Sequence, residues 1–127
     1  MKLNPDCIRD ILLYVEGNTS YRKACTIIPS LCCKTFPNYS SDEVMYHVNQ
    51  CEMSGYFSKT SSDLDGNITI VSLSPLGHQF IDNIRSDDVW KDVKQVSDTV
   101  GSKSLTALSQ IASGVITALI EHQLGLR

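Results

Sequence analysis

The chain has 127 residues, a length that suits one domain and can bury a hydrophobic core without disulfide support. Hydrophobic residues make up 42% and charged residues 20%, a globular balance that argues against a disordered chain. The net charge is −3, which argues against strong nonspecific nucleic-acid binding, because that affinity comes mainly from Lys and Arg at phosphates.

The first half of the chain predicts a helix, a strand and a short helix. Asn4 can cap a helix and Pro5 fits its first position, so we expect a helix over residues 5–16. A β-branched run predicts a strand near 24–28, and the segment 29–36, closed by a proline at each end, predicts a short helix. The apolar stripe of the first helix is Cys7, Ile8, Ile11, Leu12 and Val15.

The middle of the chain predicts a clearer helix and a hairpin. A serine cap and two acidic residues in the first turn indicate a helix over 41–54. We expect strands at 56–59 and 67–73, joined by a loose polar tip that contains an Asp-Gly turn signal. The residues of the 41–54 helix that share its apolar face are Val44, Val48 and Cys51.

Three amphipathic helices are expected in the last third of the chain. The first opens at Ser74-Pro75, the second is capped near Ser86, and the third covers about 103–123 after a break at Gly101. Their predicted apolar faces are Leu76, Phe80, Ile81 and Ile84; then Val89, Val93, Val96 and Val100 with Trp90 beside them; and then Leu105, Leu108, Ala112, Val115 and Leu119, widened by Ile111, Ile116 and Ile120.

Together these elements predict an α+β fold, in which a winged helix-turn-helix domain with a short β-sheet precedes a C-terminal helical tail. We place the winged-helix domain at residues 1–73 and the tail at 74–127. The tail either packs on the domain or pairs with a second copy, and we expect a homodimer through the C-terminal helices. The most apolar stretch, Ile111 to Ile120, is about ten residues, short of the roughly 20 that cross a bilayer, so we expect no membrane partner.

Several separated segments resemble one family of proteins. They are Met1 to Leu12, Tyr46-His47-Val48 leading to Gly55-Tyr56, Leu73 to Arg85, and Val89-Trp90. In this order they are similar to a family of small bacterial and prophage proteins known as a domain of unknown function, over nearly the whole chain. The resemblance implies a winged-helix fold and a phage or prophage setting, and it transfers no activity and no functional residue.

The helix at 41–54 occupies the recognition-helix position of a winged helix. If its apolar face lies inward, the outward side chains form a recognition surface of Asp42, Tyr46, Asn49, Gln50 and Met53. Asn and Gln can read adenine edges in the major groove. The basic residues available for phosphate contacts are Arg22, Lys23, Lys34 and Lys59.

Two partners remain open for this surface. A DNA duplex suits the fold and would make the protein a transcriptional regulator, yet the 41–54 helix carries acidic residues and no Lys or Arg. A host protein, such as an enzyme or defence factor modulated by a phage protein, suits Tyr46 and Met53, because aromatic residues and Met are enriched at protein interfaces. We therefore expect a non-enzymatic recognition protein that binds DNA or a host protein.

Metal and catalytic sites are weakly indicated. His47 and Cys51 lie one helical turn apart, and Cys25, Cys32 or Cys33 could complete a zinc site, but no paired C-x-x-C supports it. We expect a surface histidine and a buried cysteine, no metal and no cofactor.

A Cys–His nucleophile pair lacks a third orienting residue. His78, at the start of a helix, is expected to be an ordinary first-turn residue rather than part of an anion site.

The cysteines indicate a reducing compartment. Five are present, an odd number that includes an adjacent pair, and no apolar signal segment follows Met1. We therefore expect free thiols in a cytoplasmic protein.

Overall fold

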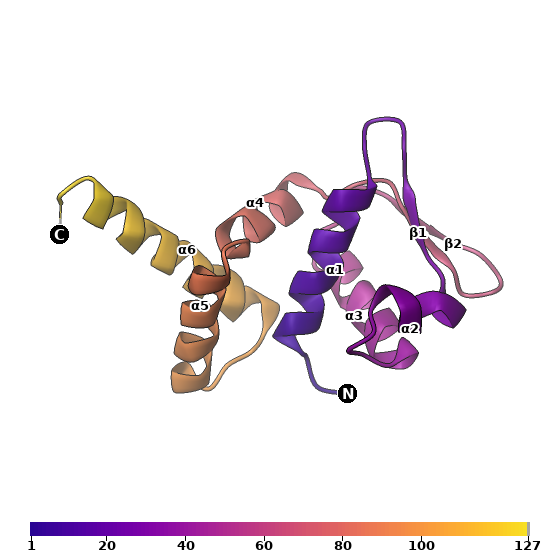
Figure 1. Ribbon diagram of the computed structural model, residues 1–127, viewed down its shortest axis with the longest axis horizontal. Helices are drawn as coiled ribbons and strands as arrows, with labels where there is room; N and C mark the ends of the chain where they lie inside the picture. The colour runs from indigo at the N-terminus through magenta and orange to yellow at the C-terminus, as the bar shows by residue number, and fades with distance from the viewer. Residues whose placement is uncertain (127) are drawn as a thin grey trace. The chain divides into compact units, whose positions relative to one another are not determined.

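The computed structural model describes residues 1–126. The chain divides into two compact units, Met1–His78 and Gln79–Arg127. Figure 1 follows the elements from α1 to α6 in chain order. The structure is α+β, with several helices and one small antiparallel sheet.

Helix α1 (Pro5–Asn18) begins at the predicted cap and extends two residues beyond the predicted end. Oδ1 of Asn4 accepts hydrogen bonds from the backbone N–H groups of Asp6 and Cys7, at 3.1 and 3.4 Å. At the other end, the side chains of Asn18 and Thr19 donate to carbonyls one turn back, at 2.8 Å each. These bonds satisfy carbonyls that a helix end leaves free, which accounts for the longer helix. Its predicted stripe is buried: Cys7, Ile8, Ile11, Leu12 and Val15.

Strand β1 (Cys25–Ile27) lies within the predicted range and is followed by a tight helical segment. That segment is a 3₁₀ turn, η1 (Pro29–Leu31), which continues as the single-turn helix α2 (Cys32–Thr35). Helix α3 (Ser41–Met53) follows, and Oγ of its cap Ser40 accepts from the Glu43 N–H at 3.1 Å. Helices α1 and α3 pack against each other.

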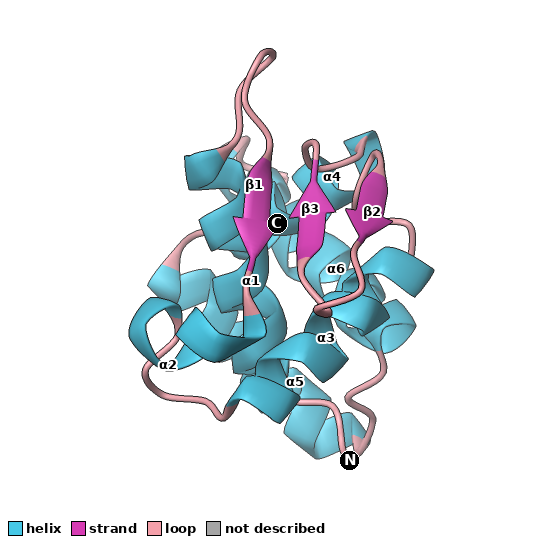
Figure 2. Ribbon diagram, turned by 90° about the vertical axis from the view of Figure 1, so that its right-hand side faces the viewer, coloured by secondary structure: helices cyan, strands magenta, loops and turns pink. Residues whose placement is uncertain are grey.

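The sheet has three antiparallel strands in the order β1-β3-β2 (Figure 2). Strand β2 is Thr60–Ser62 and β3 is Ile68–Ile70. The prediction of the first wing strand at 56–59 was wrong. Tyr56 is buried and donates its backbone N–H to the last turn of α3, and Phe57 makes only an isolated bridge to Leu73.

The hairpin tip is closed by one side chain, so the expectation of a loose tip was also wrong. Oδ1 of Asp63 accepts from the backbone N–H groups of Asp65 and Asn67, at 2.9 and 3.0 Å, and Oδ2 accepts from the Asn67 side chain at 3.0 Å. Gly66 takes a left-handed φ of 81°, which the predicted Asp-Gly turn requires.

Helix α4 (Pro75–Ile84) begins in the first unit and continues into the second. Oγ of Ser74 accepts from the Gly77 N–H at 3.1 Å, and the Ser74 N–H donates to the Tyr56 carbonyl at 2.9 Å. A Cβ at Gly77 would collide with that carbonyl oxygen, so only glycine fits there. Phe80, Ile81 and Ile84 are buried as predicted, whereas Leu76 is 46% exposed.

Helices α5 (Asp87–Val100) and α6 (Leu105–Gln123) pack against each other in the second unit. Their buried faces are shorter than predicted: Val89, Trp90 and Val93 on α5, and Leu105, Leu108 and Ala112 on α6. Val96, Val100, Leu119 and Ile120 are exposed, contrary to the predicted stripes.

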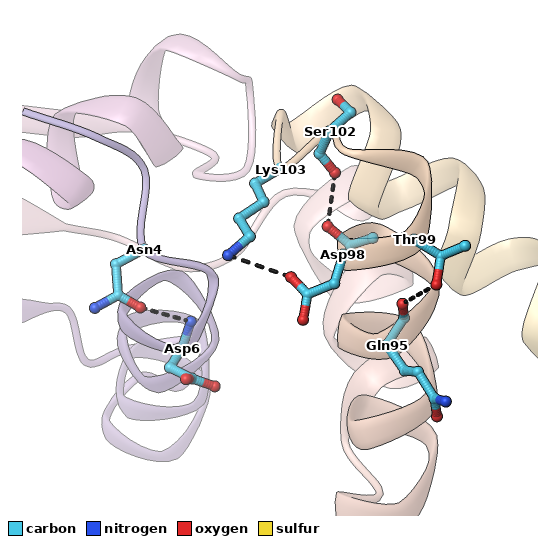
Figure 3. A network of polar contacts seen from close by, with 8 residues as sticks. Asn4, Asp6, Gln95, Asp98, Thr99, Ser102 and Lys103 are labelled. Atoms are coloured by element: carbon cyan, nitrogen blue, oxygen red, sulfur yellow. Dashed lines mark hydrogen bonds and ion pairs between the residues drawn. The ribbon is translucent and has the colours of Figure 1, made fainter.

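At the end of α5, polar side chains contact the loop that leads to α6 (Figure 3). Ser97 is buried, and its hydroxyl donates to the Ser102 carbonyl at 2.6 Å. Nζ of Lys103 lies 3.3 Å from Oδ1 of Asp98. These contacts close the loop after Gly101, which takes a left-handed φ of 81°.

Candidate recognition surface

The buried side of α3 fixes which of its side chains can reach a ligand. Val44, Val48 and Cys51 are each 0% exposed, as the sequence predicts. Of the predicted surface residues, Asp42, Asn49 and Met53 are exposed, and Tyr46 and Gln50 are partly exposed. The five residues predicted to form the recognition surface therefore all reach solvent to some extent.

His47 is buried rather than on the surface, which corrects the prediction for this residue. Its Nε2 accepts the backbone N–H of Asn4 at 2.8 Å, and its Nδ1 lies 2.6 Å from the Glu43 carbonyl oxygen. This pairing requires the neutral ring with the proton on Nδ1. The Nε2 lone pair is then occupied, so His47 is available neither to a metal nor as a base for Cys51.

Acidic charge surrounds the exposed side of α3. Asp42 and Glu52 are exposed and Glu43 is partly exposed, and the helix contains no Lys or Arg. Met53, at 72% exposure, adds a large apolar group at the end of the helix. The surface thus combines negative charge with apolar and amide side chains.

The hairpin tip adds further negative charge. Asp63 and Asp65 are exposed there. The pKa of the Asp63 carboxyl lies below its ordinary value: desolvation acts to raise it, but hydrogen bonds from Asn67, Asp65 and Gly66 together outweigh that effect. Asp63 is therefore ionised at neutral pH.

The four predicted phosphate contacts lie at two different places. Arg22 and Lys23 are in the turn before β1, and Lys59 directly precedes β2. The register pairs Ile70 with both Cys25 and Thr60, so Lys23 and Lys59 lie at one end of the sheet. Lys34 is in α2, which follows the opposite end of β1, as Figure 2 shows. The four basic side chains do not form a single cluster.

The buried thiols offer little nucleophilic character. All five cysteines are free, and only Cys33 is exposed. Burial, followed by the charges of Glu43 and Asp10, raises the pKa of Cys7 to about 12, and burial raises the pKa of Cys51 as well. A neutral thiol is neither the nucleophilic nor the metal-binding form. Within residues 1–126, no group of three His, Cys, Asp or Glu side chains is placed to hold a metal ion.

Two backbone donors at the start of α4 are occupied. The Gly77 N–H donates to Ser74 Oγ, and the His78 N–H donates to the Ser74 carbonyl at 2.9 Å. These bonds fit the expectation of an ordinary first turn.

One pocket was not predicted from the sequence. We call it the Tyr39 pocket; it has a volume of about 310 Å³ and lies between α1, which contributes Asp10, Leu13 and Tyr14, and the segment 35–39. The Tyr39 hydroxyl donates to Oδ2 of Asp10 at 2.7 Å. The only sequence signal was a concentration of aromatic residues near Pro37, which does not reveal that α1 forms the other wall.

Comparison with known proteins assigns the family. Residues 2–104 match the family described as "Hypothetical protein (DUF2513)", and the chain belongs to it. The chain is also 30% identical over 126 residues to an "Uncharacterized protein" of Haemophilus influenzae, covering 94% of this chain and 99% of that protein. No solved structure matches the chain. The family match includes α3 and the Tyr39 pocket and ends at Ser104, the cap of α6. The resemblance to a domain of unknown function is thereby confirmed.

A helix that crosses a membrane must be both long and apolar. In residues 1–126, no helix combines the length and the hydropathy needed to cross a bilayer.

Proposed function

We propose that the first unit is a winged-helix domain. The order α1, β1, α2, α3, β2, β3 and the sheet order β1-β3-β2 support this assignment. In that arrangement α3 is the recognition helix and the β2–β3 hairpin is the wing. The short α2, preceded by η1, takes the place of the first helix of the helix-turn-helix.

We further propose that this domain is a non-enzymatic recognition module whose exposed α3 side binds a basic surface on another protein. The observation that carries the proposal is the charge of α3, where Asp42 and Glu52 are exposed and no basic residue is present. Phosphates would be repelled there, whereas a protein surface rich in Lys and Arg would be complementary. Tyr46 and Met53 supply the kind of apolar anchors that protein interfaces favour.

The resemblance to small bacterial and prophage proteins is what supports the proposed cellular setting. A phage or prophage protein in the cytoplasm that modulates a host enzyme or defence factor would need a surface of this kind. The proposed partner is therefore a host protein.

A duplex is the second candidate, because Asn49 is exposed and Gln50 partly exposed at the recognition-helix position. These amides can pair with adenine in the major groove. Arg22, Lys23 and Lys34 would then supply phosphate contacts.

Affinity purification from the native host, with nuclease treatment, tests the proposal. Wild type is expected to retain a protein partner after nuclease, and the double variant Tyr46→Ala, Met53→Ala is expected to lose it. The matched control is Arg22→Ala, Lys23→Ala, two exposed residues outside α3. If nuclease releases the partner, or if the control loses it while the α3 variant keeps it, DNA recognition replaces the proposal.

We also propose that α6 pairs with a second copy of the chain. From Leu105 to Ile120 the helix carries no charged residue, so two copies would meet without like-charge repulsion. Leu119 and Ile120 are 43% and 54% exposed, and with Leu124 they line an open apolar hollow of about 240 Å³. A neutral apolar face of this kind matches a copy of itself better than it matches the charged partner proposed for α3.

A further inference from the structure

The Tyr39 pocket has the size of a receptor for one side chain. Its volume of about 310 Å³ lies at the lower end of ligand pockets, which hold roughly 300–1,000 Å³. Tyr14, Tyr39 and Leu13 are partly exposed in it, while Phe36 is 4% exposed. The pocket is thus an open, partly aromatic depression with Phe36 at its buried side.

The aromatic wall has a defined geometry. The rings of Tyr14 and Phe36 meet edge to face, with centroids 5.2 Å apart and planes at 64°. This contact holds the Tyr14 ring in place beside the pocket. An aromatic ring that is fixed and partly exposed offers its negative face to a cation.

The charge in the pocket is unbalanced. Asp10 is partly exposed and accepts the Tyr39 hydroxyl through Oδ2. Among the residues that the structure describes, no Lys or Arg nitrogen lies within ion-pair distance of Asp10. Its second oxygen therefore remains available to a donor from outside the chain.

Tyr39 keeps Asp10 in position. Burial, and then the neighbouring Asp10 carboxylate, raise the pKa of the Tyr39 hydroxyl above its ordinary value. The hydroxyl remains a neutral donor and holds one oxygen of Asp10, leaving the other in a fixed direction. A fixed carboxylate loses less entropy on binding a cation than a mobile one.

We propose that the Tyr39 pocket receives an arginine side chain of a partner protein, with the guanidinium on Asp10 and against the rings of Tyr14 and Tyr39. Arginine fits better than lysine, because its planar fork can bond a carboxylate and stack on a ring at once. Leu13 and Pro37 supply apolar surface for the aliphatic stem. The pocket uses no residue of α3, so the proposal stands independently of the α3 surface.

An NMR titration of the ¹⁵N-labelled full chain with N-acetyl-arginine amide tests this site. We expect saturable shifts confined to the amides of the pocket, and no such shifts with N-acetyl-norleucine amide. Asp10→Asn is expected to weaken binding about tenfold, the cost of replacing a charge-assisted hydrogen bond by a neutral one. This variant retains an oxygen that accepts the Tyr39 hydroxyl, so the fold is preserved.

Two variants serve as controls and one as an independent check. Asp42→Asn removes the same charge from α3, and Tyr46→Ala, Met53→Ala alters the proposed recognition surface; both are expected to bind the arginine amide as wild type does. Tyr14→Leu is expected to weaken binding through loss of the ring.

Three results would overturn the arginine site. They are shifts that never saturate, an Asp10→Asn affinity equal to that of wild type, or spermidine binding as tightly as the arginine amide. The last result would assign the pocket to a free polyamine instead of a protein side chain.

Discussion

At the scale of single residues, His47 joins two helices that are far apart in sequence. It lies in the middle of α3, yet its ring accepts the backbone N–H of Asn4, the cap of α1. The same Asn4 also donates its side chain to Glu43 at 3.4 Å. The start of α1 is therefore held to α3 by polar contacts in addition to apolar packing.

Replacing His47 by phenylalanine should destabilise the protein. The Asn4 N–H would lose its acceptor, at a cost of about 1–3 kcal/mol for an unsatisfied buried donor. Urea unfolding followed by circular dichroism measures this free energy. His78→Phe, on an exposed residue, is the matched control and should change stability by less than about 0.5 kcal/mol. An equal loss in both variants would show that the His47 bond contributes nothing.

Alkaline pH should also destabilise the fold. The pKa of Cys7 is raised from 9.0 to about 12 in the folded chain, so the folded state holds this proton more tightly than the unfolded state. That contribution to stability is complete below pH 9 and is lost as pH rises from 9 toward 12.

The urea concentration at the midpoint of unfolding should therefore decrease as pH is raised from about 9 to about 11, within the roughly 9–12 range in which such a linkage acts. A Cys7→Ala variant should show a weaker decline over the same range. If the urea midpoint decreased equally with pH in both proteins, Cys7 would not be the cause of the decrease.

Burial of polar residues was the hardest feature to predict at this scale. The apolar spacing on α3 identified Val44, Val48 and Cys51, but a histidine beside that stripe does not reveal whether it has a buried partner. The partner of His47 lies 43 residues away in the chain. The partner of Asp10 was equally hidden, because Tyr39 lies 29 residues away in the chain.

At the scale of elements, local signals predicted helices better than strands. Asn4, Ser40 and Ser86 each cap a helix through a side-chain oxygen, and all three helix starts were expected. Strand β2 consists of Thr60, Ser61 and Ser62, which are polar on both faces and carry no alternating pattern. The adjacent aromatic pair Tyr56 and Phe57 resembles a strand more closely, yet both side chains belong to the core.

The start of α4 depends on one glycine. Gly77→Ala should destabilise the first unit, because the new Cβ meets the Tyr56 carbonyl oxygen and the backbone must move. We expect a loss of roughly 1–3 kcal/mol, as for overpacking in a close contact.

Gly17→Ala is the matched control in α1, where a new Cβ meets nothing within 4 Å. It should leave stability unchanged or raise it by up to about 1 kcal/mol. Thermal unfolding of the two variants measures the difference, and a Gly77→Ala protein as stable as wild type would contradict the close contact.

At the scale of the whole molecule, the exposed apolar side chains of α6 are relevant to the proposed pairing of two copies. The pattern of α6 predicts an apolar stripe along its full length, but only its first half is buried in this chain. Periodicity identifies an apolar face without identifying what covers it. That is why the sequence predicted the buried residues of α6 only in part.

The mass of the chain in solution tests the proposed pairing. Wild type should elute as a dimer in size-exclusion chromatography with light scattering, at twice the 14.1 kDa of one chain. Ile120→Glu places two like charges in the proposed interface and should give a monomer. Thr106→Glu, on an exposed residue at the other end of α6, is the control and should remain dimeric. A monomeric wild type would exclude this interface.

The charge of the molecule underlies the proposed choice of partner. The exposed side of α3 and the hairpin tip are both acidic, and the basic residues lie at two separate places. A winged helix that binds duplexes needs positive charge where the recognition helix and the wing approach the phosphates. The fold class alone does not decide the ligand, because one fold hosts many functions.

Fluorescence anisotropy of a labelled random-sequence duplex at low salt, titrated with the full chain, tests this account most directly. We predict no saturable binding by wild type, and none by Arg22→Ala, Lys23→Ala, Lys34→Ala. Saturable binding that weakens as salt is raised, and that the triple variant loses, would contradict the account and assign the α3 surface to DNA.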